Sequence, residues 1–272
     1  MATIVGNDIS EFQNNTNWDT YKNNTNFVII RATVGTARVD KNFVSNRTEA
    51  RARGIPLGFY HYAYPQYNTP EAEADYVRSV MGDIRDGELI ALDYEESWSG
   101  NVVDFCKRFL DKLSSSLNGY KPLIYLNQSL IKGYDWTPVV NGGYGLWVAA
   151  YTYDPNKNNF VTGAWKFAAM QQWTSSQQVP GLVGNVDGDV FFGDVATFKK
   201  YGYHSPVVVP PDDPCANVKQ QLDVANQGLA KAKADLVALQ TLTTKQLADK
   251  DKLCLQKISD MKQKITTYVN GL

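Results

Sequence analysis

The stretch ELIALDYE, residues 88–95, decides how this chain is expected to fold. Its centre is a short continuous apolar run, which is typical of a strand that is buried on both faces of a parallel sheet. Side chains alternate along a strand, so the carboxyl groups of Asp93 and Glu95 are expected on one side, with Tyr94 on the other. The stretch therefore predicts a buried strand that presents two acids at its C-terminal end.

Further runs of the same kind lie on both sides of this stretch. They cover residues 4–9, 27–32, 57–63, 122–126, 145–151, 167–174 and 187–192. Helical patterns separate the earlier runs, at residues 42–53, 70–86 and 101–117. Alternating strands and helices over about 200 residues predict a parallel α/β fold, and eight strands indicate a barrel. After Asn127 the helical patterns become short or vanish, so loops are expected between the last strands.

The composition is that of an ordinary globular protein. The chain has 272 residues, of which 43% are hydrophobic and 20% are charged, with a formal net charge of −1. This balance excludes a wholly disordered chain, and the near-neutral charge argues against non-specific nucleic-acid binding. No segment approaches the roughly 20 apolar residues of a membrane-spanning helix. Residues 1–10 show no secretory signal pattern, so no signal peptide is expected.

The chain shows few signs of a metal or a cofactor. Its three cysteines have no CxxC spacing, which argues against a zinc site and a disulfide scaffold. Cys106 lies in the amphipathic pattern VVDFCKRFL and is expected to be a small buried hydrophobe. Asp187 and Asp189 lack the spaced oxygen ligands of a calcium loop. There is no phosphate-binding or dinucleotide-binding glycine motif. We therefore expect no metal and no cofactor.

The last part of the chain differs in composition from the rest. Apart from Tyr268, all aromatic residues precede residue 212, and residues 203–214 form a proline-rich linker. In residues 215–272, apolar side chains recur at coiled-coil spacing, at Val218, Leu222, Ala225, Leu229, Ala232, Leu236 and Leu239. The pattern shifts phase near residues 241–246. Two arrangements follow, a helical hairpin or a long self-associating helix with a stutter, and we favour an oligomer.

Acidic residues recur at the predicted ends of strands. Asp8 ends the first run, Asp93 and Glu95 end the fourth, and Asp187 opens the last. In an α/β barrel such positions meet at one mouth. Two crowded carboxyl groups cannot ionise equally, so one keeps its proton beside an ionised partner, which is the arrangement that glycosidases use. The alternative is that the acids only end a strand and cap the next loop.

Aromatic residues also gather at or just beyond the predicted strand ends. They are Tyr60, Tyr62, Tyr64, Trp98, Tyr125, Trp147, Tyr151 and Trp173. Their flat faces can stack on sugar rings, although rings of this size also fill a barrel interior. His61, which lies among them in GFYHYAY, is expected to be a satisfied core or rim histidine.

Several motifs, taken in order, carry a resemblance to a known family. They are NDISEFQ (7–13), FVIIRATVG (27–35), GIPLGFYHYAY (54–64), LIALDYEE (89–96), PLIYLNQ (122–128), YGLWVAAY (144–151), MQQWTSS (170–176) and NVDGDVF (185–191). Together they resemble glycoside hydrolase family 25, the N-acetylmuramidases of phage endolysins and bacterial autolysins. The resemblance implies a (β/α)5(β)3 barrel in residues 1–202, followed by the linker 203–214 and the tail 215–272.

The resemblance also implies a chemistry. Glu95 would be the general acid, while Asp93, Asp8 and Asp187 would complete an acidic floor that stabilises positive charge on the sugar and its acetamido group. Retention by substrate assistance and retention through a carboxylate nucleophile both remain open. The expected substrate-binding residues are Tyr62, Tyr125, Trp147, Tyr151, Trp173 and Asp189.

The chain departs from the family pattern at three places. Val34 stands where the family commonly has Glu, and Gln171-Gln172-Trp173 stands where it has Trp-Gln-Tyr. Asp189 stands where the family usually has Asn, which adds an acid beside Asp187. The first departure is expected to alter the mouth of the barrel, and the second to move an aromatic face within it.

Two hypotheses of function follow. In the first, a phage-encoded enzyme cleaves the β-1,4 bond between N-acetylmuramic acid and N-acetylglucosamine in peptidoglycan. It would be made in the host cytoplasm and released to the wall, or carried on the virion. In the second, the chain is a virion-associated interaction protein that assembles through residues 215–272, with lysis secondary. An inactive glycan-binding barrel is disfavoured, because Asp93 and Glu95 are both present.

Overall fold

A computed structural model describes residues 2–206 and, in the C-terminal part, residues 222, 233, 250, 252 and 256–265. The chain divides into two compact units, Met1–Pro206 and Val207–Leu272. Residues 256–265 are helical, and Ile258, Met261 and Ile265 are exposed on them. The rest of the predicted coiled-coil or hairpin tail, and most of the predicted linker, lie outside the described residues. The predicted domain boundaries stay predictions.

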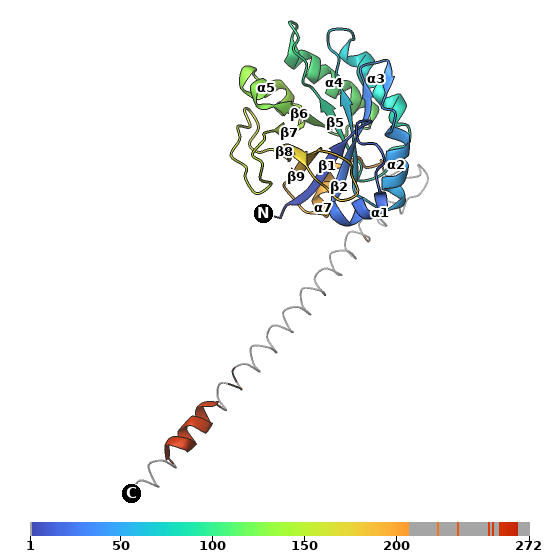
Figure 1. The fold of residues 1–272 in the computed structure, drawn as a ribbon. Helices are drawn as coiled ribbons and strands as arrows, with labels where there is room; N and C mark the ends of the chain where they lie inside the picture. Colours follow the sequence, from blue (N-terminus) through green and yellow to red (C-terminus); the bar gives the residue numbers. More distant parts are fainter. Residues whose placement is uncertain are drawn as a thin grey trace. The chain divides into compact units, whose positions relative to one another are not determined.

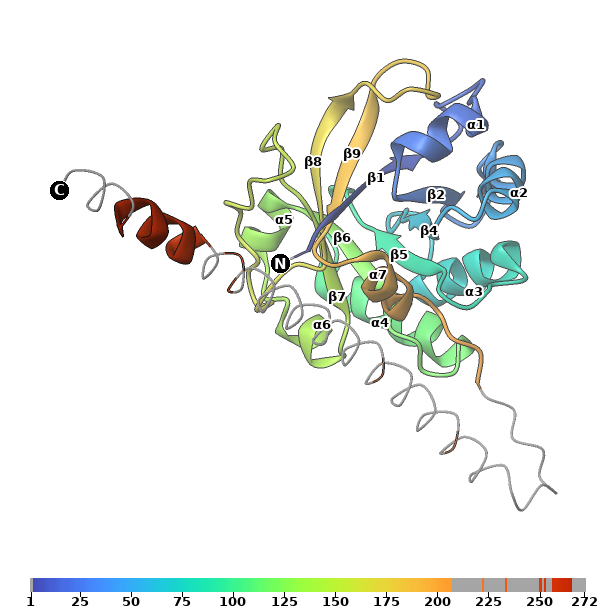
Figure 2. The ribbon, with the colours of Figure 1, turned by 90° about the horizontal axis from the view of Figure 1, so that it is seen from below.

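The first unit is a closed barrel (Figures 1 and 2). Its strands are β1 (Ile4–Ile9), β2 (Phe27–Val34), β3 (Arg38–Val39), β4 (Leu57–Tyr62), β5 (Leu89–Asp93), β6 (Leu123–Asn127), β7 (Gly145–Ala149), β8 (Met170–Gln177) and β9 (Val186–Phe191). They pair in the order β1-β9-β8-β7-β6-β5-β4-β2-β3, and a further β1–β2 pairing closes eight of them into a ring. The short β3 is an added edge strand on β2. The predicted α/β barrel is confirmed.

One strand runs against the expected direction. The barrel strands from β1 to β8 are parallel, but β9 is antiparallel to both of its neighbours, β8 and β1. The predicted parallel arrangement therefore holds for the other barrel strands, while β9 is reversed. The physical reason is the short connection, residues 178–185, because a parallel crossover needs a dozen residues or more. The reversal places Asp187, near the start of β9, at the same end of the barrel as the C-terminal end of β1.

Helices follow each of the first five barrel strands. They are α1 (Trp18–Tyr21) with the 3₁₀ turn η1 (Lys22–Asn24), α2 (Phe43–Ala52), α3 (Pro70–Met81), α4 (Val102–Ser116), and the pair α5 (Gln128–Gly133) and α6 (Thr137–Asn141). No helix separates β7, β8 and β9 in this described part of the chain, and α7 (Val195–Tyr201) comes after them. Element order thus follows the expected five strand–helix units and three strands.

Local signals explain where α3 begins and ends. The Thr69 side chain accepts a hydrogen bond from the main-chain N–H of Ala72, and Pro70 occupies the first turn. The helix ends at Met81, earlier than the predicted 70–86, because Gly82 takes a φ of 56°. A positive φ is open to glycine and interrupts the helical path.

Two apolar layers hold the barrel together. Inside it, side chains such as Phe27, Leu89 and Met170 fill the end that Phe198 of α7 closes. A larger layer lies between the strands and the surrounding helices α2, α3 and α4 (Figure 2). Cys106 of α4 is fully buried in this outer layer, as predicted. The inner layer leaves the opposite end of the barrel free for polar groups.

His61 is a structural residue, as the sequence predicted. It is fully buried, with Nδ1 2.7 Å from Thr33 Oγ1 and Nε2 2.8 Å from Glu73 Oε2. Glu73 also accepts hydrogen bonds from the Tyr64 main chain and the Asn68 side chain. The network joins β4 to β2 and α3 beside the barrel mouth. Among the described helices, none is long and apolar enough to cross a membrane.

Candidate active site

The four predicted catalytic acids meet at the mouth of the barrel. Asp8 on β1 lies directly opposite Asp187 on β9, and Asp93 ends β5 between Tyr62 and Tyr125 of the neighbouring strands. A cavity of about 220 Å³ opens here, and Asp8, Asp93, Glu95 and Asp187 all line it. The strand directions thus bring together residues that are far apart in the sequence.

Asp93 and Glu95 form the pair that the strand alternation predicted. Asp93 is buried, whereas Glu95 lies beyond the strand and is exposed at the rim. Tyr94, between them, points the other way and is buried against Phe105 of α4. Burial raises the pKa of Asp93, and the charge of Glu95 raises it further. Partial loss of hydration also raises the pKa of the Glu95 carboxyl, which hydrogen bonds with Asp93.

Asp8 and Asp187 form a second cluster of acidic side chains. Burial raises the pKa of Asp8, and the nearby charge of Asp187 adds to the effect. Burial likewise raises the pKa of the half-buried Asp187 to about 6, with Glu95 adding to it. Protons therefore stay on part of this cluster at pH values where ordinary carboxyl groups have lost them. The site can combine a proton donor with ionised neighbours.

Asp189 lies beneath the cavity and not in its lining. Its side chain is 0% exposed, and Trp147 Nε1 donates to Oδ1 at 3.0 Å. Burial raises its pKa, and a hydrogen bond with Asp8 raises it further. The predicted direct contact of Asp189 with substrate does not fit this position. Asp189 is instead a buried neighbour of Asp8, and its burial favours the protonated form.

Gln172 holds several of these groups in place, although the sequence analysis did not select it for the site. Its Nε2 donates to Asp8 Oδ2 at 2.8 Å. Its Oε1 accepts hydrogen bonds from Tyr125 Oη at 2.8 Å and from Tyr151 Oη at 3.1 Å. The amide therefore fixes one oxygen of Asp8 and orients two aromatic rings. The sequence signal for Gln172 was its central position in Gln171-Gln172-Trp173, which corresponds to the family's Trp-Gln-Tyr. Attention went instead to the aromatic positions on either side of it.

Arg31 is a second residue that the sequence analysis missed. It lines the cavity from β2, and its guanidinium donates to Asp40 Oδ2 at 2.9 Å and Glu11 Oε1 at 3.1 Å. Its positive charge opposes the rise in the pKa of Asp93. The exposed ring of Phe12 lies over it, with its centroid 5.2 Å away. A charged residue inside the apolar run 27–32 was the available signal.

The aromatic residues divide into those at the cavity and those away from it. Tyr62, Tyr125, Trp147 and Tyr151 line the cavity, together with Tyr60. Trp147 is buried and meets Tyr125 edge to face, while Tyr151 is exposed at the rim. Trp173 does not line the cavity, because it follows Gln172 on β8 and its ring lies against Gly188. Tyr64 and Trp98 also lie outside the lining.

The other departures from the family pattern lie away from the cavity. Val34 is buried at the end of β2 beside Arg38 and Tyr62, and it is not part of the lining. Gln171 faces the opposite side of β8, where its Nε2 donates to Ala150 O at 2.9 Å. No trio of acidic, histidine or cysteine side chains within the described ranges is arranged to hold a metal ion.

A closed α/β barrel whose mouth holds crowded carboxyl groups and aromatic rings defines a hydrolase of the glycosidase class. The sequence pattern of glycosyl hydrolases family 25 matches residues 7–182. The chain therefore belongs to glycosyl hydrolase family 25, and the family resemblance of its motifs is confirmed.

Individual relatives agree with this assignment. Lysozyme M1 of Streptomyces globisporus is 28% identical over 217 residues, which are 71% of this chain and 69% of that protein. The bacterial lysozyme of Streptomyces coelicolor has a similar structure, with a TM-score of 0.65 and 26% identity over 74% of this chain and 98% of that one. The catalytic domain of endolysin ply40, from bacteriophage P40 of Listeria monocytogenes, also has a similar structure, with a TM-score of 0.61. It is 28% identical, and the match covers 73% of this chain and 98% of that domain.

Proposed function

We propose that this chain hydrolyses the β-1,4 bond between N-acetylmuramic acid and N-acetylglucosamine in peptidoglycan. The observation that carries the proposal is the Asp93–Glu95 pair, which opens on a cavity shared with Asp8 and Asp187. Membership of family 25 and the likeness to named lysozymes and an endolysin support this substrate class.

Glu95 is the proposed proton donor to the leaving glycosidic oxygen. It is the exposed member of the pair and stands at the rim, where an incoming glycan strand arrives first. Asp93 is buried behind it and cannot reach an oxygen outside the cavity without moving. The raised pKa of Glu95 favours a retained proton at mildly acidic pH, which general acid catalysis requires.

Asp93, Asp8 and Asp187 are proposed to stabilise the positive charge that develops on the sugar and its acetamido group. Their carboxyl groups surround the cavity, so ionising any one of them places a negative charge beside that region. The expected outcome is retention of configuration. Attack by the substrate's own acetamido oxygen and attack by a carboxylate remain the two routes, and the arrangement is compatible with both.

Tyr62 and Tyr151 are proposed to contact the sugar rings. Both line the cavity and keep an accessible ring face. Tyr125 and Trp147 are more deeply buried, so their proposed part is to shape the floor and hold Gln172 and Asp189. This division follows from exposure, because a ring must reach solvent before a polymer can stack on it.

Glu95→Gln tests the proposal directly. The amide keeps the shape of the side chain and cannot release a proton, so wall clearance is expected to fall by about 10²–10⁴. Clearance of purified cell walls is measured by turbidity, and the products are identified by mass spectrometry. The proposed bond predicts products with N-acetylmuramic acid at the new reducing end.

The matched control is Glu71→Gln, which removes an exposed acid of α3 that pairs with Arg108. It is expected to clear walls as the unaltered protein does. Near-normal clearance by Glu95→Gln would reject Glu95 as the acid. Products that end in N-acetylglucosamine would reject the bond while leaving the glycosidase class intact.

A phage origin and action on the host wall after release, or from the virion, are part of the same proposal. The likeness to a phage endolysin supports them. The predicted coiled-coil pattern of the tail supports self-association, and so do Ile258, Met261 and Ile265, which are exposed on the helical residues 256–265. Sedimentation of the full chain against residues 1–206 tests this, and two monomers would contradict it.

A further inference from the structure

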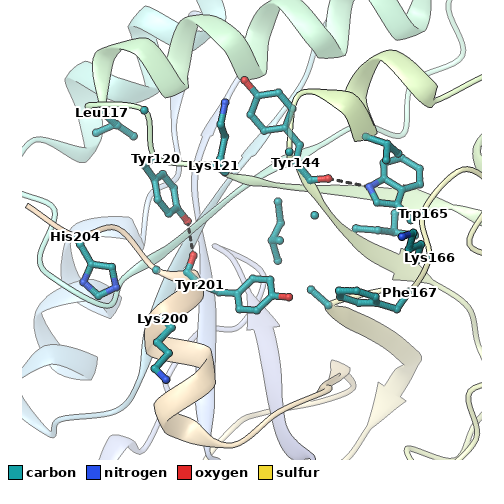
Figure 3. Close-up of a pocket in the computed structure, with 18 of the residues that line it drawn as sticks. Leu117, Tyr120, Lys121, Tyr144, Trp165, Lys166, Phe167, Lys200, Tyr201 and His204 are labelled. Atoms are coloured by element: carbon teal, nitrogen blue, oxygen red, sulfur yellow. Dashed lines mark hydrogen bonds between the residues drawn. The ribbon is translucent and has the colours of Figure 1, made fainter. Parts of the chain in front are cut away.

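A second, larger cavity lies at the other end of the barrel (Figure 3). It has a volume of about 740 Å³ and is formed by residues that precede or begin β6, β7 and β8, together with the end of α7. Because these strands are parallel, this end is opposite to the acidic mouth. None of the acids of the mouth lines it.

The charge of this cavity is of one sign. Lys121, Lys166 and Lys200 line it, and no aspartate or glutamate does. Within the described residues, none of the three lysines forms a salt bridge. Lys121 lies near Asp111, and its Nζ is 4.8 Å from the centroid of the Tyr144 ring, while Lys200 lies near Asp194. The cavity therefore offers positive charge to an anionic ligand.

Aromatic rings form much of the apolar surface of the cavity, and two of them are held by hydrogen bonds of their polar atoms. Trp165 Nε1 donates to Tyr144 O at 2.8 Å, and Tyr120 Oη donates to Tyr201 O at 3.0 Å. These bonds fix the two rings in the wall of the cavity. Phe167 is 65% exposed, and Figure 3 shows the Tyr201 ring pointing toward it across the opening.

A neighbouring cavity extends this surface. It has a volume of about 710 Å³ and shares Phe167, Ala169 and Tyr201 with the first. Its lining adds Asn156, Asn158 and Phe160, and no lysine. One cavity thus combines rings with lysines, and its neighbour combines rings with side-chain amides. A ligand made of several linked units suits this pair, since a small molecule would occupy only one of the two cavities.

We propose that these two cavities form one binding groove for an anionic glycan, distinct from the acidic mouth. Sugar faces would pack on Phe167 and Tyr201, and carboxylate or phosphate groups would meet Lys121, Lys166 and Lys200. An apolar ligand would leave the lysines unused, and a bare anion would leave the rings unused. The proposal does not depend on the function of Glu95.

Binding is measured by calorimetry on the full chain, with three tetrasaccharide probes. Tetragalacturonate carries carboxylates, a phosphorylated maltotetraose carries phosphate, and unmodified maltotetraose is neutral. We expect at least one charged probe to bind at least about tenfold more tightly than the neutral one, and to weaken as salt is raised. The two charged arms show which anion the groove takes.

Two variants locate the binding. The double variant Lys121→Gln, Lys200→Gln and the single variant Phe167→Ser are each expected to weaken the charged probe at least about fivefold. The control Lys22→Gln, Lys41→Gln removes two exposed charges elsewhere and is expected to bind normally. These side chains are exposed, so the fold is expected to persist, which circular dichroism checks.

Three results would overturn the proposal. The first is equal binding by the groove variants and the control, and the second is equal binding of the charged and neutral probes. The third is a change in sedimentation of the groove variants without any loss of glycan binding, which would show that a second copy or the chain's own tail occupies the groove. Loss of wall clearance is not a readout, so failure of the proposed enzymatic function is recognised separately.

Discussion

The two ends of the barrel are opposites in charge, size and organisation. At the mouth, four carboxyl groups line a cavity of about 220 Å³, and a glutamine ties one of them to two tyrosines. At the other end, three lysines and several fixed rings line a cavity of about 740 Å³. One end concentrates like charges in a small space, and the other spreads them around a wide opening.

This difference shows which end stores unfavourable electrostatic energy. Burial and mutual repulsion raise the pKa of Asp8, Asp93 and Asp187, so ionising them at neutral pH destabilises the fold. The lysine side chains at the other end remain exposed to water and carry little such cost. Changes at the mouth should therefore alter activity and pH dependence, while changes at the other end should leave both unaltered.

Among the substitutions that test this difference between the two ends, the largest effect is expected at Asp93. Asp93→Asn keeps the size of the side chain but removes the carboxyl group that can ionise beside Glu95. We expect kcat to fall by at least about 10², with KM changed little, because the lost interaction forms with the charged transition state. Reducing-end release from purified peptidoglycan measures both constants. A kcat within threefold of normal would show that the mouth works without this carboxylate.

Gln172→Met is expected to have the next largest effect. It removes the amide donor to Asp8 and the acceptor for Tyr125 and Tyr151. Leaving buried groups unpaired costs about 2–4 kcal/mol of unfolding free energy, and we expect activity to fall as well. Denaturant unfolding and the rate of wall hydrolysis are measured together.

The matched control is Tyr120→Phe at the other end. It leaves the main-chain groups Ile90 N and Tyr201 O unpaired, at a cost of about 1–3 kcal/mol. Its kcat is expected to stay normal. Equal losses of kcat in both variants would mean that activity follows stability, and that the mouth is not the more sensitive end.

Asp187→Asn tests the stored electrostatic energy through pH. The pKa of Asp187 is raised to about 6, whereas an unfolded aspartate ionises near 4. Between these values the folded state holds the extra proton, so this contribution to stability is present at pH 4 and is lost as the pH rises through 6. The variant is therefore expected to gain about 1–2 kcal/mol over the unaltered protein at pH 8, and nothing at pH 4. Thermal unfolding at both pH values measures this, and a pH-independent difference would contradict it.

Sequence patterns predicted the acidic end much better than the lysine end. The rule that strand ends meet at one mouth pointed to Asp8, Asp93 and Glu95, and the family resemblance gave roles to these three acids and to Asp187. It could not give the direction of β9, which depends on the length of residues 178–185 and on which neighbours the strand finds. No comparable rule applies to Lys121, Lys166 and Lys200, which come together only when loops and α7 pack against the strand beginnings.

Choosing the site residue within one motif was harder than recognising the motif itself. Gln172 and Trp173 are adjacent, and aromatic chemistry favoured the tryptophan. Strand alternation gives Gln172 the cavity side and leaves Trp173 outside the lining. Predicting this required knowing which face of β8 points inward, which the polar pattern of residues 170–177 does not reveal. The family's aromatic residue at a neighbouring position also drew attention to Trp173 and away from Gln172.

The smallest effect is expected at Trp173. Comparing it with Trp147 tests which of the two tryptophans near the mouth belongs to the site. The Trp173 indole N–H is buried without a hydrogen-bond partner, so Trp173→Phe removes an unpaired donor and is expected to change stability by less than about 1 kcal/mol. We expect kcat/KM to stay within twofold. Trp147→Phe is the contrast, because it removes the donor to Asp189 Oδ1, and we expect it to lower both activity and stability. If Trp173→Phe lost activity tenfold while Trp147→Phe did not, substrate would reach β8 outside the cavity, and the boundary of the site drawn from Gln172 would be wrong.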